Sequence, residues 1–166
     1  SSLASEDFNG DGYADLIIGS PEFDGSYELQ GRVTLLFGSK SGLDIVNRHT
    51  FSAEDEFGQI GTTVSNAGDT DGDGLNEWMT NGGLFDTSGS FYEDGGIWVV
   101  SGQTTSWGQE NDLTDVATFI SGTAGSAAGL ALEHADVNMD GYSDLIIGAP
   151  YAGNYYGAVY LLFGGK

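Results

Sequence analysis

Short apolar runs alternate with polar, glycine-rich connections along the whole 166-residue chain. Runs such as "DLII" and "VTLL" are typical of strands with at least one buried face. Gly supplies 28 residues and Pro only 2, a balance that favours short strands joined by tight turns over helices. About ten strands are expected, at residues 15–18, 32–37, 48–51, 62–65, 77–80, 96–100, 118–120, 130–135, 143–147 and 158–163.

The strand pattern occurs in three copies. The acidic stretch that starts at Asp7 returns at Asp69 and at Asp136, and "DLIIGSP" at 15–21 matches "DLIIGAP" at 144–150. "GRVTLLFG" at 31–38 likewise matches "GAVYLLFG" at 157–164, with "GGIWVVSG" at 95–102 as the middle copy. Such a repeated unit cannot bury its apolar face alone, so the chain is expected to be one repeat domain with approximate units 1–56, 57–120 and 121–166.

Four strands in the middle unit predict a propeller blade. We therefore expect an all-β fold of β-propeller type, with about three four-stranded antiparallel blades. The first unit begins at its acidic loop and is expected to lack its first strand, whereas the third is expected to lack its last. Propellers usually have at least about four blades, so the chain is expected to be part of a larger propeller or to be completed by another chain.

The three acidic loops have the spacing of calcium ligands. In a D-x-[DN]-x-[DN]-G loop, positions 1, 3 and 5 supply side-chain oxygens, Gly at position 6 allows a sharp bend, and position 7 supplies a carbonyl. Position 9 is also acidic in every copy. The expected metal ligands are Asp7, Asn9, Asp11, Tyr13 and Asp15; Asp69, Asp71, Asp73, Leu75 and Glu77; and Asp136, Asn138, Asp140, Tyr142 and Asp144.

An EF-hand is excluded because that motif needs a bidentate Glu at position 12, where this chain has Ile18, Thr80 and Ile147. Acidic turns without a metal are the simpler alternative, but a turn needs only some of the positions that all three copies fill. Mg²⁺ fits less well because it prefers a strict octahedron with bound waters. About three Ca²⁺ ions are expected, together with calcium-dependent folding.

Charge and composition exclude several classes of binding partner and of chemistry. The formal net charge is -21, from 25 acidic residues against 4 Lys and Arg, so nucleic acid and anionic membranes are repelled. No Cys is present, which excludes disulfides and thiolate chemistry. No apolar run approaches the ~20 residues of a membrane span, and the first residues lack the pattern of a signal peptide.

The quoted loop-and-strand copies, above all "DFNGDGYADLIIGSP" at 7–21 and "DVNMDGYSDLIIGAP" at 136–150, resemble the FG-GAP repeat of the integrin alpha-subunit β-propeller. The resemblance covers nearly the whole chain. It implies that each acidic loop joins the first two strands of a blade and binds Ca²⁺ through the residues named above. The middle copy departs from the pattern, with Asn81-Gly82-Gly83 in place of Gly-Ala-Pro. The Phe-Gly element is filled by Phe57-Gly58 or Ile60-Gly61 in the second unit and by Ala128-Gly129 in the third.

Catalytic motifs are scarce in the sequence. His49 and His134 are the only histidines, and neither a G-x-S-x-G nor an H-E-x-x-H motif is present, so no enzyme activity is expected. Trp98 is expected in the core. Trp107 and the aromatic run 151–156 lie in connections and are candidates for a ligand surface.

The expected function is that of a calcium-binding propeller segment of a cell-surface or secreted protein, acting in adhesion by binding a protein or a glycan. One alternative is an architectural repeat, a filament or spacer subunit in which neighbouring chains complete each other's blades. A weaker one is the non-catalytic propeller of a larger secreted enzyme. The extracellular location rests on the calcium loops and on the resemblance.

Overall fold

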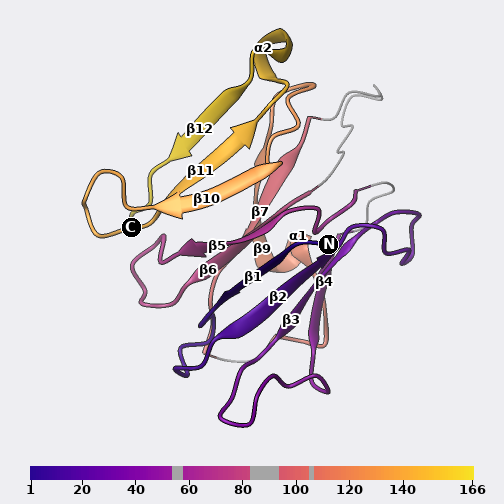
Figure 1. The fold of residues 1–166 in the computed structure, drawn as a ribbon, viewed down its shortest axis with the longest axis vertical. Helices are drawn as coiled ribbons and strands as arrows, with labels where there is room; N and C mark the ends of the chain where they lie inside the picture. Colours follow the sequence, from indigo (N-terminus) through magenta and orange to yellow (C-terminus); the bar gives the residue numbers. More distant parts are fainter. Residues whose placement is uncertain (54–57, 83–93, 105–106) are drawn as a thin grey trace.

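The computed structural model describes residues 1–53, 58–82, 94–104 and 107–166, which form three β-sheets (Figure 1). The first sheet has the order β1-β2-β3-β4-β8, the second β5-β6-β7-β9 and the third β10-β11-β12. The strands are β1 (Leu3–Glu6), β2 (Asp15–Ser20), β3 (Arg32–Leu36), β4 (His49–Ser52), β5 (Val64–Gly68), β6 (Glu77–Asn81), β7 (Gly96–Val100), β8 (Glu110–Asp112), β9 (Ala117–Ser121), β10 (Ala131–Ala135), β11 (Asp144–Ala149) and β12 (Ala158–Leu162). Two short helices, α1 (Leu113–Val116) and α2 (Ala152–Tyr155), complete the described elements.

The expected all-β fold of propeller-type repeats is confirmed, and a strand overlaps each of the ten expected positions. The third sheet has three described strands, as an incomplete last blade requires. The first unit differs from the expectation, because Leu3–Glu6 forms the strand it was expected to lack. This segment pairs antiparallel with β2 from Leu3 opposite Ile18 to Glu6 opposite Asp15. Its four residues are too few and too polar to predict a strand, so the pairing with β2 decides it.

A segment of the middle unit adds a fifth strand to the first sheet. β8 lies between β7 and β9 in sequence, yet it pairs parallel with β4, with Thr50 opposite Glu110. The helix α1 follows at once and places Leu113 in the core, where it is fully buried. Three polar residues, Glu-Asn-Asp, give no strand signal in the sequence, so this crossover could not be expected from it.

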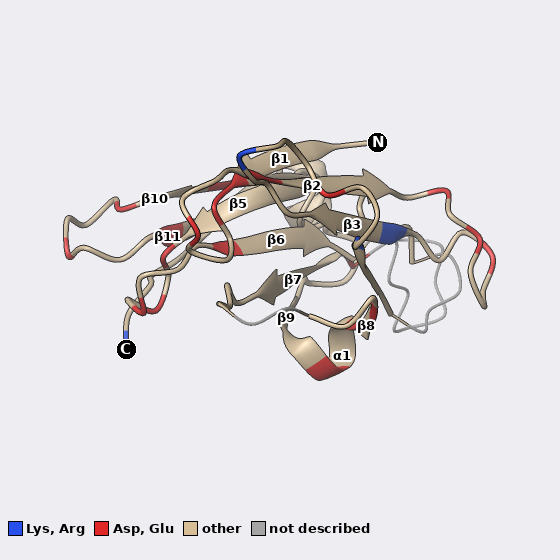
Figure 2. Cartoon of the chain, turned by 90° about the horizontal axis from the view of Figure 1, so that it is seen from below, with Lys and Arg blue, Asp and Glu red and all other residues tan. Residues whose placement is uncertain are grey.

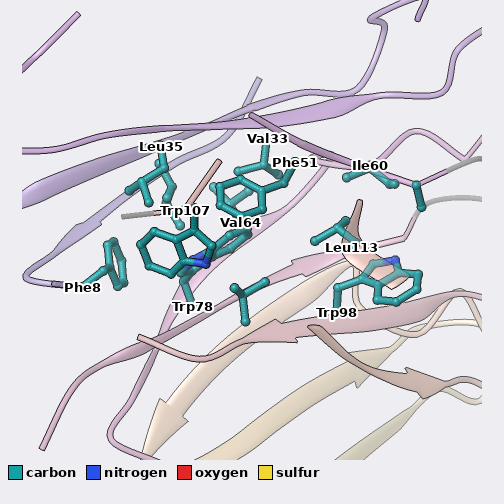
Figure 3. Close-up of a cluster of buried hydrophobic side chains, with 13 residues drawn as sticks. Phe8, Val33, Leu35, Phe51, Ile60, Val64, Trp78, Trp98, Trp107 and Leu113 are labelled. Atoms are coloured by element: carbon teal, nitrogen blue, oxygen red, sulfur yellow. The ribbon is translucent and has the colours of Figure 1, made fainter. Parts of the chain in front are cut away.

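The middle sheet is packed on both faces. Its Trp78, Trp98 and Val100 join a core cluster with Val33 and Phe51 of the first sheet (Figure 3). Met79 and Ile97 join a second cluster that includes residues of the third sheet. Neighbouring residues on one strand point to opposite faces, so the middle blade is buried between the other two.

Trp107 belongs to this core, so its assignment to a ligand surface is wrong. Its side chain is only 6% exposed and stacks against Phe37 with 5.9 Å between ring centroids. Phe51 contacts the same indole edge-on. The strand β8 and helix α1, which follow Trp107, draw the connection onto the first sheet, and the sequence pattern does not reveal that contact. Trp98, 5% exposed, lies in the core as expected.

Two equivalent bridges join successive units. Gly31 pairs parallel with Ile60, and Gly95 pairs parallel with Ala128. Ile60-Gly61 and Ala128-Gly129 therefore occupy the same place in the second and third units, whereas Phe57 lies outside the described residues. A Cβ atom on Gly31 would lie 2.2 Å from the backbone nitrogen of Ile60, so this contact between units requires glycine.

Candidate metal centres

Each acidic loop connects the first and second strands of its sheet: β1 to β2, β5 to β6, and β10 to β11. The first strands lie side by side, with β5 between β1 and β10. The three loops consequently lie along one side of the molecule, on the left in Figure 1. All nine residues at positions 1, 3 and 5 are half-buried or exposed, whereas the acidic residue at position 9 is buried in each copy.

The position 1 carboxylate turns each loop inward. Asp7 Oδ2 accepts a hydrogen bond of 2.8 Å from the N–H of Gly12, at position 6. Asp69 and Asp136 accept the equivalent bonds from Gly74 and Gly141, at 3.0 and 2.9 Å. The same arrangement in three places indicates that the loop geometry is set by the local sequence.

Positions 3 and 5 accept hydrogen bonds in the same repeated way. The side-chain oxygen at position 3 accepts from the N–H of position 5, and that at position 5 accepts from the N–H of position 7. In the first loop these are Asn9 Oδ1 with Asp11 N and Asp11 Oδ1 with Tyr13 N, each at 2.9 Å. The corresponding distances in the other loops lie between 2.8 and 3.0 Å. The side-chain oxygens at positions 3 and 5 therefore point toward the backbone of their own loop in all three copies.

Position 6 needs glycine for its backbone angles. Gly12, Gly74 and Gly141 have φ of 87°, 92° and 94°, in the left-handed region that other residues avoid. Position 4 is also left-handed, with Gly10 and Gly72 in two copies. Met139 occupies this position in the third loop with φ of 63°, so the third loop carries backbone strain that the others lack.

The position 9 carboxylate has a structural role that the spacing alone did not reveal. Asp15 Oδ2 accepts from the N–H of Phe8, and Oδ1 accepts from the N–H of Gly38 after the third strand. The residue at position 9 of the other two copies makes the same two contacts: Glu77 with Thr70 and Gly102, and Asp144 with Val137 and Gly164. We call this pair of contacts the carboxylate clamp.

Close backbone packing explains the glycine at the far end of each clamp. A Cβ atom on Gly38 would lie 2.2 Å from the carbonyl oxygen of Ala14, and one on Gly164 would lie 2.4 Å from that of Ser143. On Gly102 it would lie 2.6 Å from the carbonyl oxygen of Asn76. The sequence signal was the glycine that closes each "LLFG" or "VVSG" copy.

Burial makes two of the clamp carboxylates, Asp15 and Glu77, costly to charge. Desolvation raises the pKa of Asp15 and of Glu77, and the backbone N–H groups that they bind partly oppose this rise. Glu77 Oε2 accepts two hydrogen bonds, from the N–H and the hydroxyl of Thr70, whereas Glu77 Oε1 and both oxygens of Asp15 accept one each and keep a lone pair for a second partner. A nearby cation would favour the charged form, so the clamp residues fit a metal centre as well as their structural role.

The middle loop has the closest group of carboxylates. Carboxylate oxygens of Asp69, Asp71 and Glu77 lie within 4.8 Å of one another, the one such group of acidic or histidine side chains within the described parts of the chain. In the other two loops an asparagine amide oxygen takes position 3, as Asn9 and Asn138. A set of carboxylate, amide and carbonyl oxygens is the chemistry that a hard divalent cation prefers.

Neighbouring loops are hydrogen-bonded to each other. The side chain of Asn76, at position 8 of the second loop, donates to the carbonyl oxygen of Asp7 at 3.2 Å. The backbone N–H of Ser143, at position 8 of the third loop, donates to the carbonyl oxygen of Asp69 at 2.9 Å. A change in one loop is therefore transmitted to the contact between two units.

Comparison with protein families matches residues 1–36 and 128–162 to the model of the FG-GAP repeat. The chain belongs to the FG-GAP repeat family. The matched segments hold the first and third acidic loops, and the middle FG-GAP copy has the same strand order and loop hydrogen bonds. The resemblance to the FG-GAP repeat is thereby confirmed.

Relatives of the FG-GAP chain include integrin alpha pat-2 of Caenorhabditis elegans, 32% identical over 177 residues, and integrin alpha-V of Gallus gallus, 30% identical over 155. They match 99% and 89% of this chain, which spans 14% of each relative. Phosphatidylinositol-glycan-specific phospholipase D of Dictyostelium discoideum is 28% identical over 184 residues, covering 99% of this chain and 19% of the relative. Within the described residues, neither α1 nor α2 is long and apolar enough to cross a membrane.

Proposed function

We propose that the chain is a calcium-binding segment of a cell-surface or secreted FG-GAP propeller, with a non-catalytic role in adhesion through protein or glycan binding. The observation that carries the proposal is the threefold repetition of one loop geometry, in which side-chain oxygens at positions 1, 3 and 5 accept hydrogen bonds from the backbone of their own loop. The integrin alpha relatives support the adhesive role. The high negative charge suits a cation-loaded surface and opposes binding to nucleic acid.

In this proposal each loop holds one Ca²⁺ through five residues, at positions 1, 3, 5, 7 and 9. Positions 1, 3 and 5 supply side-chain oxygens, position 7 supplies its carbonyl, and the clamp residue at position 9 supplies a further carboxylate. The ion supplies positive charge that offsets repulsion between carboxylates. Because the clamp residue also binds the end of the third strand, a loop fixed by calcium orders the sheet beside it.

Exposed aromatic side chains offer a surface for the adhesive partner. Tyr151, Tyr155 and Tyr156 are 49%, 68% and 93% exposed, and the rings of Tyr151 and Tyr155 meet edge-on with centroids 5.7 Å apart. They surround the turn of α2, on the third sheet. Aromatic faces exposed on a connection are typical of protein and glycan contacts.

Two further roles have support. The open edge of β12 and its exposed Val159 favour the architectural alternative, in which a neighbouring chain completes the third blade. The similarity to a phospholipase D favours the other, a non-catalytic propeller within a larger secreted enzyme. Calcium loops with a structural role belong to all three.

Single substitutions at position 5 test the calcium proposal. Asp11→Ala, Asp73→Ala and Asp140→Ala each remove an exposed side-chain oxygen ligand, and Asp115→Ala on α1 is the matched control outside the loops. Calcium titration by calorimetry is expected to show one site weakened in each loop variant and an unchanged total in the control. Calcium binding that survives all three loop substitutions together would contradict the proposal.

A further inference from the structure

Both arginines of this acidic chain line one pocket. The sequence has only four basic residues, Arg32, Lys40, Arg48 and Lys166. Figure 2 shows how few basic positions stand among the many acidic ones, with one of them on β3. The pocket has a volume of about 170 Å³ and is lined by Arg32, Val46, Arg48, Thr50, Gln109 and Glu110.

The strand alternation places this pocket on the outer face of the first sheet. Val33 and Phe51 are fully buried in the core between the first and second sheets. Their neighbours Arg32 and Thr50 therefore point to the opposite face. The parallel pairing of β4 with β8 adds Glu110 opposite Thr50, so the crossover from the middle unit forms one wall.

The two guanidinium groups have unused binding capacity. Arg32 stacks on the Phe23 ring, 3.8 Å from its centroid, while its buried Nε has no hydrogen-bond partner within the described residues. Across the same residues, neither Arg32 nor Arg48 forms an ion pair, although the chain has 25 acidic residues. Two unpaired guanidinium groups at one pocket are suited to a carboxylate, because its two oxygens accept paired hydrogen bonds from the N–H groups of an arginine.

The size of the pocket and its residues other than the arginines indicate which kind of ligand it can bind. The pocket is smaller than the roughly 300–1,000 Å³ of sites for drug-sized ligands, so it suits one small group. The net charge of -21 repels polyanions, which favours a ligand with a single negative charge. Glu110 would repel a bare carboxylate but accepts hydrogen bonds from hydroxyl groups, and the side-chain amide of Gln109 both donates and accepts. A carboxylate that carries hydroxyl groups beside it satisfies both requirements.

We propose that this pocket binds a carboxylated sugar of the uronic acid class. Arg32 and Arg48 hold the carboxylate, Glu110 and Gln109 hydrogen-bond the hydroxyl groups, and Val46 contacts the ring. This inference names a ligand class for the glycan binding proposed above, and the choice of a sugar rests on that proposed function. The pocket contains none of the calcium-loop residues, so the two proposals fail separately.

Calorimetric titration with glucuronate, glucose and glutarate tests the site on the full chain in saturating calcium. Glucuronate is expected to bind, glucose to bind at least roughly tenfold more weakly, and glutarate to bind more weakly than glucuronate. Arg48→Gln changes an exposed side chain and is expected to weaken glucuronate binding by roughly tenfold or more. Lys40→Gln makes the same charge change outside the pocket and is expected to leave binding unchanged.

Glu110→Gln separates sugar recognition from simple charge attraction. It is expected to weaken glucuronate binding, because a neutral amide oxygen accepts hydroxyl hydrogen bonds less strongly than a carboxylate and one of the two acceptor oxygens is lost. It is expected to strengthen glutarate binding, because the repelling charge is removed. Equal affinity for glutarate and glucuronate would overturn the sugar class. The site itself would be overturned by glucuronate binding that is absent or insensitive to Arg48→Gln. It would also be overturned by association between copies that Arg48→Gln abolishes, since the arginines would then face another chain. Melting curves of each variant in calcium verify that the fold is kept.

Discussion

At the scale of single residues, backbone angles and buried carboxylates decide how each loop behaves. The left-handed position 4 is glycine in two loops and Met139 in the third, where the side chain is 90% exposed. Because this methionine packs against little, its main energetic effect is the strain of its backbone.

Met139→Gly is therefore expected to stabilise the third loop. Relief of left-handed strain, less the entropy cost of glycine, predicts about 0.5–1 kcal/mol of added stability. Chemical denaturation in calcium measures it. The reverse test is Gly141→Ala at position 6, where no atom lies within 4 Å of the added Cβ and only the φ of 94° opposes it. A loss of about 1–2 kcal/mol is expected there. A destabilised Met139→Gly variant would refute the strain argument.

Substitutions in the carboxylate clamp and in the exposed loop carboxylates are expected to affect stability and calcium binding differently. Glu77→Gln places an amide N–H₂ against backbone N–H donors, so we expect a loss of about 1–3 kcal/mol even in EDTA. Asp71→Asn is exposed and is expected to weaken calcium binding while leaving the stability in EDTA almost unchanged. Unfolding of both variants with and without calcium makes the comparison. Equal effects in EDTA would show that the clamp has no structural role of its own.

The repeated form of the three loops was predictable from the sequence, because the geometry at positions 1, 3 and 5 is set within a few residues. The metal ligands named there stay a prediction. The sequence did not predict the clamp, because Asp15 and Gly38 are far apart in the sequence and meet only when β2 and β3 pair. The sequence did not predict the pocket of Arg32 and Arg48 either, because one of its walls is β8, whose pairing with β4 has no signal in the sequence pattern.

At the scale of elements, the crossover formed by β8 and α1 ties the second unit to the first. Leu113 of α1 is fully buried in the core between them, whereas Ile45, in the corresponding connection between β3 and β4, is 70% exposed. The two residues are similar in size and chemistry and differ chiefly in burial.

Leu113→Ala is expected to destabilise the chain by about 2–5 kcal/mol, because it leaves a cavity in the shared core. Ile45→Ala, the matched control, is expected to change stability by less than about 0.5 kcal/mol. Denaturant unfolding at saturating calcium measures both. Similar losses for the two variants would show that the crossover does not hold the units together.

Strand positions were predictable where an apolar run marks them, as in β2, β7 and β11. β1 and β8 were missed because short polar segments become strands only through their partners. Trp107 was misassigned for the same reason, since its connection is drawn into the core by a contact with another unit.

At the scale of the whole molecule, the third sheet has an open side. Val159, Leu161 and Phe163 are 71%, 43% and 63% exposed, whereas Val33 and Leu35, at the first two corresponding positions of the first unit, are fully buried. An exposed apolar face of a sheet favours packing against another sheet, and the unpaired edge of β12 among the described strands favours pairing with another strand.

If copies of the chain complete each other's blades, association should use this side. Val159→Lys is then expected to shift a concentration-dependent oligomer to monomer, because a buried lysine without a partner is costly. Thr104→Lys, an exposed position in the described part of the middle unit, is the control. Analytical ultracentrifugation in calcium distinguishes the states. A monomeric wild-type chain at every concentration would exclude the architectural alternative.

Calcium dependence of folding tests the central claim most directly. Thermal unfolding should be measured in EDTA, then after calcium or magnesium is added back. The account predicts a large fall in melting temperature on chelation that Ca²⁺ restores and Mg²⁺ does not, because three carboxylate-rich loops are then left without their cations. An unchanged melting temperature in EDTA would contradict it and leave the three loops as acidic turns.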